Sequence, residues 1–217
     1  MVHRRQVDNE TLIFGVHGAL LGNAMTWWDH GTGSIWTQPT GEAIAGPRKG
    51  QTVELLPSQF TSWSAWKEAY PNTQALDVPA GPSSFDLTDF LIVVDFTDEA
   101  RGYPIPDLRQ VGVVNDTVAG VPIAVVSDPA DPTRWSVFSR MVGGDVREFD
   151  MVNGELVEPS TGTTFNPARG FGLDGPLSEE ALDHLAAFTS FPSDFGTFWP
   201  DGTVWDIDAV DANAGDE

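Results

Sequence analysis

The sequence predicts a mainly β fold (a β-rich α+β fold) with two pseudo-repeated halves, each with short antiparallel strands and one or two short helices. Three observations support this prediction. Short runs of strand-forming residues alternate with turns that contain Gly or Asn. Helical patterns are confined to a few short segments. A phrase rich in Gly, Thr, Pro and aromatic residues occurs twice.

The repeated phrase reads DHGTGSIWTQPTGEAIAGP in residues 29–47 and STGTTFNPARGFGLDGP in residues 160–176. Its matching positions keep a constant offset of 129 residues. Upstream, VDNETLIF (7–14) faces VGGDVREF (142–149). We interpret the two copies as an internal duplication that forms a pseudo-symmetric pair, because two copies are too few for a solenoid. The shared Gly and aromatic positions indicate needs of folding.

The first half, residues 1–76, begins with a predicted hairpin. Its strands, TLIFGV (11–16) and ALLGNAMTWW (19–28), are rich in strand formers and are separated by a Gly-containing turn. Shorter strands are expected in SIWTQ (34–38) and TVELL (52–56).

A short helix is expected in SWSAWKEAY (62–70), because a Ser stands at its start, Trp63 and Trp66 are three residues apart, and Pro71 follows. Residues 77–88 are rich in Pro, Gly and Ser, and we expect them to form a linker between the halves.

The second half, residues 89–205, is expected to open with a buried strand in DFLIVVDF and a helical turn in YPIPDLRQ. The segment GVVNDTVAGVPIAVVS (112–127) predicts a strand, a turn and a strand, with Asn115 and Asp116 near the corner. The loop DPADPT (128–133) follows.

A meander with turns at residues 143–144 and 153–154 comes next. The clearest helix signal lies in SEEALDHLAAF (178–188), where a Ser can cap the first turn and two Glu favour the helix dipole. Residues 206–217 are expected to form an acidic, frayed tail.

The composition predicts a globular, salt-adapted protein. The 217 residues are 41% apolar and include eight Trp, which permits a sizeable core. Eleven basic and 32 acidic residues give a net charge of −21, whose self-repulsion strong salt would screen. The alternative is an acidic surface for a basic partner. Nucleic-acid binding is not expected, because the sequence has no basic patch.

The chain has no cysteine, which excludes disulfides, thiolate nucleophiles and Cys-ligated zinc. No apolar run approaches the roughly 20 residues of a transmembrane segment, and no secretory signal is recognisable at the start. The expected location is the cytoplasm, or outside it if a longer N-terminus carries a signal.

Candidate binding residues are polar or aromatic and lie in both halves: Asp29, His30, Trp36, Gln38, Glu42, Asn115 and Asp116. Asp29 and His30 precede a Gly-Thr-Gly turn, where a carboxylate beside an imidazole can bind a metal or act as a base. The alternative is a solvated hairpin corner. Asn115 and Asp116 also suit a purely structural turn.

Gln38 and Glu42 are replaced by Pro167 and Phe171 in the second copy, so the shared fold does not require them. They belong either to a site in the first copy or to a drifting surface. His184 falls in the expected helix and is assigned to its surface. No His-x-x-x-His or Glu-x-x-His spacing predicts a metal site, and no cofactor is predicted.

Three segments resemble the family named domain of unknown function 3179: FGVHGALLGNAMTWWDHGTGSIWTQPTGEAIAGP, TSWSAWKEAYPNTQAL and ARGYPIPDLRQVGVVNDTVAGVPIAVV. The resemblance extends from about Val7 to Trp205. It implies a related fold and no known activity.

The chain departs from the family's pattern, in which a block like Ala100–Val126 ends in a Cys-Pro-Leu-Cys segment and precedes a block like Val2–Leu76. Here the first half opens within the second block, and residues 127–132 replace the cysteines. Either the natural protein is longer, with a cysteine-bearing front, or this is a shortened relative.

The expected function is a non-enzymatic binding or structural module with an unknown ligand. The alternative is a part or remnant of a metal- or redox-linked enzyme whose reactive Cys segment is absent from this chain.

Overall fold

A computed structural model describes residues 1–58, 61–75, 89–97, 99–128 and 131–208. The expected linker, 77–88, and most of the expected acidic tail lie outside these residues, so both stay predictions.

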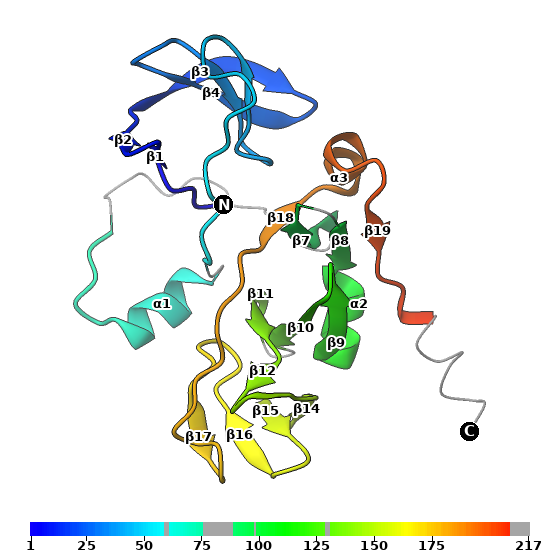
Figure 1. Ribbon diagram of the computed structural model, residues 1–217. Coiled ribbons are helices and arrows are strands. Elements are labelled where there is room, and N and C mark those ends of the chain that lie inside the picture. Colours follow the sequence, from blue (N-terminus) through cyan, green and yellow to red (C-terminus); the bar gives the residue numbers. More distant parts are fainter. Residues whose placement is uncertain (59–60, 76–88, 98, 129–130, 209–217) are drawn as a thin grey trace. The chain divides into compact units, whose positions relative to one another are not determined.

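The chain forms two compact units, and each unit is assembled from segments that are far apart in the sequence. The first unit is Met1–Ser58, Leu91–Gly102 and Leu185–Trp205; the second is Gln59–Phe90, Tyr103–His184 and Asp206–Glu217. In Figure 1, for example, β7 and β8 (green) lie beside β18 and β19 (orange to red).

The first unit contains a short hairpin, β1–β2, and a four-stranded antiparallel sheet in the order β3-β4-β5-β6. These strands are β1 Gln6–Val7, β2 Glu10–Thr11, β3 Phe14–Leu21, β4 Ala24–Asp29, β5 Ile35–Thr37 and β6 Ala43–Ala45. Strand β3 forms an edge of its sheet, and a register shift between Val16 and Leu20 marks a bulge in it.

A second sheet of this unit has the order β18-β7-β8-β19 and carries the helix α3. Its elements are β7 Leu91–Phe96, β8 Glu99–Pro104, β18 Phe188–Ser190, α3 Pro192–Phe198 and β19 Thr203–Val204. Helix α3 begins at a Pro, whose missing N–H costs nothing in the first turn, and Asp194 in that turn favours the helix dipole.

The second unit contains a three-stranded sheet, a short hairpin, a four-stranded sheet and two helices. The sheets have the orders β11-β10-β9 and β14-β15-β16-β17. The elements are α1 Trp63–Ala69, α2 Ile105–Val111, β9 Val113–Val118, β10 Val121–Asp128, β11 Asp131–Ser139, β12 Met141–Val142, β13 Asp145–Val146, β14 Asp150–Val152, β15 Glu155–Glu158, β16 Thr163–Phe165 and β17 Gly172–Asp174.

Aromatic pairs lie at the centre of each unit's core. In the first unit Phe14 meets the fully buried Trp36 edge-on, with ring centroids 5.6 Å apart. In the second unit Phe149 meets Phe165 in the same way, at 5.9 Å. A further cluster in the first unit packs Phe195 of α3 against β7, β8 and β18.

Backbone hydrogen bonds recur 129 residues apart. Gly41 donates to Thr37 and Val53 donates to Gly41; correspondingly, Gly170 donates to Asn166 and Leu182 donates to Gly170. Both glycines have positive φ, and a Cβ on Gly41 would stand 2.6 Å from the Val53 carbonyl oxygen. These positions therefore need Gly for the close approach of two backbone segments.

The predicted fold class is confirmed: the chain is mainly β, with three short helices among the described residues. The helix predicted over 62–70 is α1, and the helical turn in YPIPDLRQ is α2. No helix in the described part of the chain is long and apolar enough to cross a membrane.

The helix predicted over 178–188 is wrong, because tertiary packing overrides the local helix signal there. The segment forms a turn, then bridges Ala181 to Phe171 and His184 to Phe138, and ends in β18. Leu182 is buried in the core. His184 is not on a helix surface, since its ring lies 4.6 Å from that of Phe138 and burial lowers its pKa.

Two predicted turns are also misplaced. The β3–β4 turn lies at Gly22 and Asn23 instead of before Ala19, because the bulge carries β3 past Gly18. Asn115 and Asp116 lie inside β9, opposite Ala124 and Ile123, rather than at the corner. The corner is formed at residues 119–120, both with positive φ. Residues 52–56, predicted as a strand, form isolated bridges.

Prediction for the core. We expect Phe165→Ala to lower the free energy of unfolding by about 3–5 kcal/mol, because it removes a fully buried ring and leaves a cavity. Phe171→Ala is the matched control in the same unit; that ring is 41% exposed, and its loss should cost about 0.5 kcal/mol or less. Urea unfolding followed by tryptophan fluorescence measures both. Equal losses would contradict this description of the core.

Candidate functional site

Asp29, the first predicted site residue, ends β4 and is fully buried. Its carboxylate accepts hydrogen bonds from the Trp36 indole Nε1 at 3.0 Å and from the Thr32 backbone N at 2.6 Å. The Thr32 hydroxyl lies 2.9 Å from both carboxylate oxygens. The side chain therefore fastens the Gly-Thr-Gly turn to the core below it.

Glu158 performs the same task at the equivalent position of the second unit. It is buried at the end of β15 and accepts hydrogen bonds from the backbone N atoms of Ser160 and Thr161, both at 3.0 Å. The hydroxyl groups of these two residues also donate to it. A carboxylate that recurs with the same turn in both units is explained by the fold alone.

The two carboxyl groups have lowered pKa values. Burial by itself would raise the pKa of Asp29, but the hydrogen bonds from Trp36 and Thr32 and the charge of Arg48 outweigh it. Burial opposes ionisation of Glu158 in the same way, and the hydrogen bonds from Ser160 and Thr161 hold its pKa below the usual range. Both groups therefore act as anions that stabilise the fold.

His30 is exposed, and its ring stacks on that of Trp28 with centroids 4.2 Å apart and planes 8° from parallel. Asp29 and His30 thus have different side-chain partners in the described residues. The Trp28 ring in turn covers Gly15 across the strand pair, where an added Cβ would stand 2.6 Å from the indole nitrogen.

Gln38 and Glu42 are both half-buried beside the same turn. The Gln38 carbonyl oxygen accepts a hydrogen bond from the His3 ring at 2.9 Å, and burial lowers the pKa of His3. The Glu42 backbone bridges Thr52, as the Phe171 backbone bridges its own partner in the second unit.

Asn115 and Asp116 are in the second unit, so the seven predicted residues are not all held by one unit. The Asn115 side chain donates to the Phe149 carbonyl oxygen at 2.8 Å and accepts from the Phe149 backbone N at 3.0 Å. Asp116 accepts a hydrogen bond from the Tyr103 hydroxyl at 2.7 Å. Both contacts join strands or segments within the unit.

The β3–β4 hairpin is the main feature of the first unit that sequence reasoning did not assign to a site. Phe14 and Asp29 correspond to Phe149 and Glu158, yet the first pair is six residues farther apart in the sequence. The extra residues lengthen the hairpin, whereas its counterpart β14–β15 turns at Asn153 and Gly154 after a three-residue strand.

The longer hairpin is exposed and apolar. Five of its large apolar side chains are 38–68% exposed: Ile13, Val16, Leu20, Leu21 and Met25. No Asp, Glu, Lys or Arg occurs between Glu10 and Asp29. We call residues 13–25 the apolar hairpin. A change of the repeat offset, from 135 residues upstream to 129 downstream, is the sequence signal that locates it.

The tip of the apolar hairpin lies against α3. The Asn23 backbone N contacts the buried Asp194 carboxylate at 3.4 Å, and an added Cβ on Gly22 would stand 3.8 Å from the Phe198 ring. Phe198 also lines a shallow pocket of about 260 Å³, in which the Trp199 indole donates to Asp95 at 2.8 Å. The hairpin and this pocket thus adjoin the same short helix.

Acidic or histidine ligands do not gather in this unit or in the other. Among the residues that the structure describes, no three His, Asp or Glu side chains lie close enough together to hold a metal ion.

The comparison with known families agrees with the resemblance found in the sequence. Residues 1–85 match the family described as Protein of unknown function (DUF3179). No curated protein and no solved structure matches the chain. The match contains the Asp29 turn, the apolar hairpin and α1, and it assigns none of them an activity.

Prediction for the buried carboxylates. We expect Asp29→Asn to destabilise the protein by about 1–3 kcal/mol at neutral pH, because a charge-assisted hydrogen-bond network loses its anion. The pKa of Asp29 is lowered by folding, so its stabilising effect is present above the unfolded pKa, about 4, and is lost as the pH falls through the folded value.

The difference in melting temperature between wild type and Asp29→Asn should therefore shrink below about pH 4. Asp174→Asn, at an exposed carboxylate, is the control and should show no such difference at either pH. A gap that stays constant from pH 7 to pH 3 would show that Asp29 is not an ionised anchor.

Proposed function

We propose that this protein is a non-enzymatic binding module whose contact surface is the apolar hairpin. The observation that carries the proposal is the six-residue extension, which is apolar and exposed in the first unit and absent from the matching hairpin of the second. The second unit forms the same turn and the same aromatic core without it. The extension is thus not a requirement of the shared fold.

Keeping these side chains in water has a cost. Burying a Leu or Val side chain is worth about 1.5–3 kcal/mol, and Val16 and Leu20 forgo most of that gain at 68% and 65% exposure. An exposed apolar strand at a sheet edge is also an aggregation risk, which natural proteins usually counter with charge. A surface kept uncharged under those conditions is typical of a contact site.

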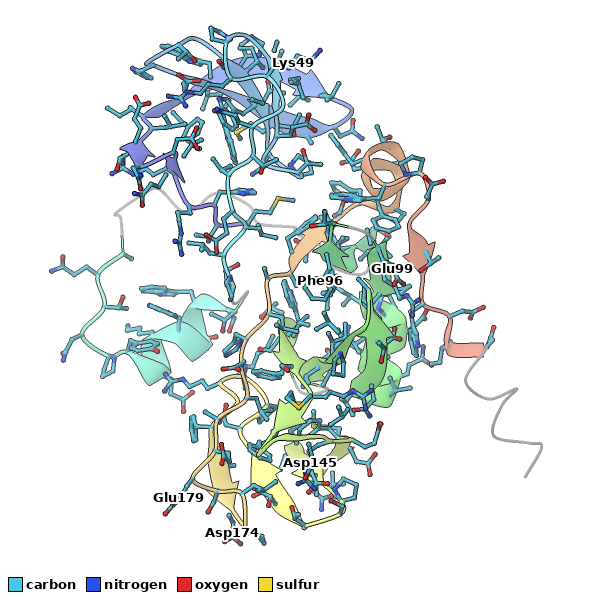
Figure 2. The ribbon with its side chains drawn as sticks, viewed as in Figure 1. Lys49, Phe96, Glu99, Asp145, Asp174 and Glu179 are labelled. Carbon is cyan, nitrogen blue, oxygen red and sulfur yellow. The ribbon has the colours of Figure 1, made fainter. Side chains whose placement is uncertain are left out.

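The proposal includes adaptation to salt. The net charge is −21, and carboxylates such as Asp145, Asp174 and Glu179 are exposed; Figure 2 shows them at the outer end of the second unit. Strong salt screens such charges within a few ångströms and strengthens apolar contacts. An internal duplication is part of the same proposal, and the recurring hydrogen bonds and paired carboxylate turns support it.

The alternative, a part of a metal- or redox-linked enzyme, stays a prediction. Metal analysis of the purified chain tests it, and a stoichiometric metal would favour it over the binding module.

Prediction for the apolar hairpin. The double substitution Val16→Thr and Leu20→Thr should change the free energy of unfolding by about 0.5 kcal/mol or less, because both side chains are mostly exposed. It should also reduce binding of the apolar dye bis-ANS, measured by fluorescence on dilute protein.

The matched control is Val152→Thr with Leu173→Thr in the second unit, where the side chains are 47% and 46% exposed. These residues lie outside the hairpin, so dye binding should fall less. A loss of more than about 1.5 kcal/mol in the hairpin variant would show that the extension serves folding, and the binding proposal would fail.

Prediction for salt. The melting temperature should rise by several degrees between about 0.2 and about 3 M KCl, since screening removes repulsion in the folded state. Differential scanning calorimetry measures it. A melting temperature independent of KCl would refute salt adaptation while leaving the hairpin untouched.

A further inference from the structure

We propose that the partner of the apolar hairpin is a second copy of this chain, so that the protein forms a two-fold dimer with the hairpins of both copies in contact. This inference rests on the proposed function and names the partner for the same surface.

The first step concerns charge. Two copies that each carry −21 repel one another wherever their acidic surfaces face. The stretch between Glu10 and Asp29 is the longest in the sequence without Asp, Glu, Lys or Arg. It is therefore the part of the chain where a like-charged copy approaches with the least repulsion.

The second step concerns the kind of partner. A basic protein would be drawn to carboxylates, and the hairpin offers none between Glu10 and Asp29. What the hairpin offers is aliphatic: Val16 is 68% exposed, Leu20 65% and Leu21 41%. Aliphatic side chains are complementary to other aliphatic side chains, and a two-fold axis places the same patch on both sides of the interface.

The third step concerns geometry. Strand β3 is an edge strand, and in the described part of the chain no other strand pairs with its outer side. Its register shift at residues 16–20, with Gly18 at a φ of 86°, interrupts a flat edge. An unbroken ladder of backbone hydrogen bonds between two copies is therefore disfavoured, and the contact is expected through side chains.

The dimer predicted in this way has a characteristic salt response. Added KCl screens the repulsion between two acidic copies and strengthens apolar contact, so association becomes tighter. Association of an acidic protein with a basic partner would become weaker under the same change.

The experiment is sedimentation velocity of the full chain at about 1–100 µM in about 0.5 and about 3 M KCl. We expect a monomer–dimer equilibrium with a larger dimer fraction at high salt. Leu20→Lys should raise the dimer Kd at least tenfold, because the interface then buries two unpaired charges.

Val152→Lys is the matched control: it places the same charge on β14, the edge strand of the second unit, at a side chain that is 47% exposed. It should leave the Kd unchanged. Circular dichroism of both variants confirms that they fold, and Val16→Thr with Leu20→Thr tests the interface without a new charge.

A wild-type chain that stays monomeric at about 100 µM in about 3 M KCl overturns the dimer. So does a Leu20→Lys variant that dimerises like wild type, or a Val152→Lys variant that alone prevents dimerisation. These results would leave the binding proposal standing if the Thr variant keeps its stability and loses dye binding. A Thr variant that unfolds would end both.

Discussion

A buried carboxylate that closes a tight turn is the interaction on which each unit depends. Asp29 in one unit and Glu158 in the other accept hydrogen bonds from the turn that follows them. That turn sends the chain back as the next strand, and this strand places Trp36 or Phe165 at the centre of the core. A buried anion is stable only when its lone pairs are used, so the turn and the core require each other.

The two carboxylates reach the same result with different donors. Trp36 supplies an indole N–H to Asp29, whereas Phe165 at the equivalent position has no donor. In the second unit Ser160 replaces Gly31 and supplies both a backbone and a hydroxyl donor to Glu158, whose side chain is one methylene longer. The exchange of Trp, Gly and Asp for Phe, Ser and Glu is therefore a compensated set, in which each anion stays satisfied.

Where the two units differ, the difference lies on the surface. The apolar hairpin is longer in the first unit and uncharged, while exposed carboxylates cover the outer end of the second. Charge and apolar area act in opposite directions here, because the acidic surface prevents association and the hairpin favours it. A protein with both features associates through one place, and salt decides how strongly it does so.

The sequence by itself determined the strand-rich class, the Gly and aromatic frame shared by both halves, and α1, because these depend on local backbone preference and on short-range patterns. Only the tertiary structure decided three things. Residues 178–188 lost their helix, because burying Leu182 in the core outweighs a capped first turn. Asp29, Asn115 and Asp116, predicted as a site, became fasteners, because their partners come from other strands or turns. The apolar hairpin emerged as a surface, since a run of strand-forming residues reads the same in a sequence whether it ends in the core or in water.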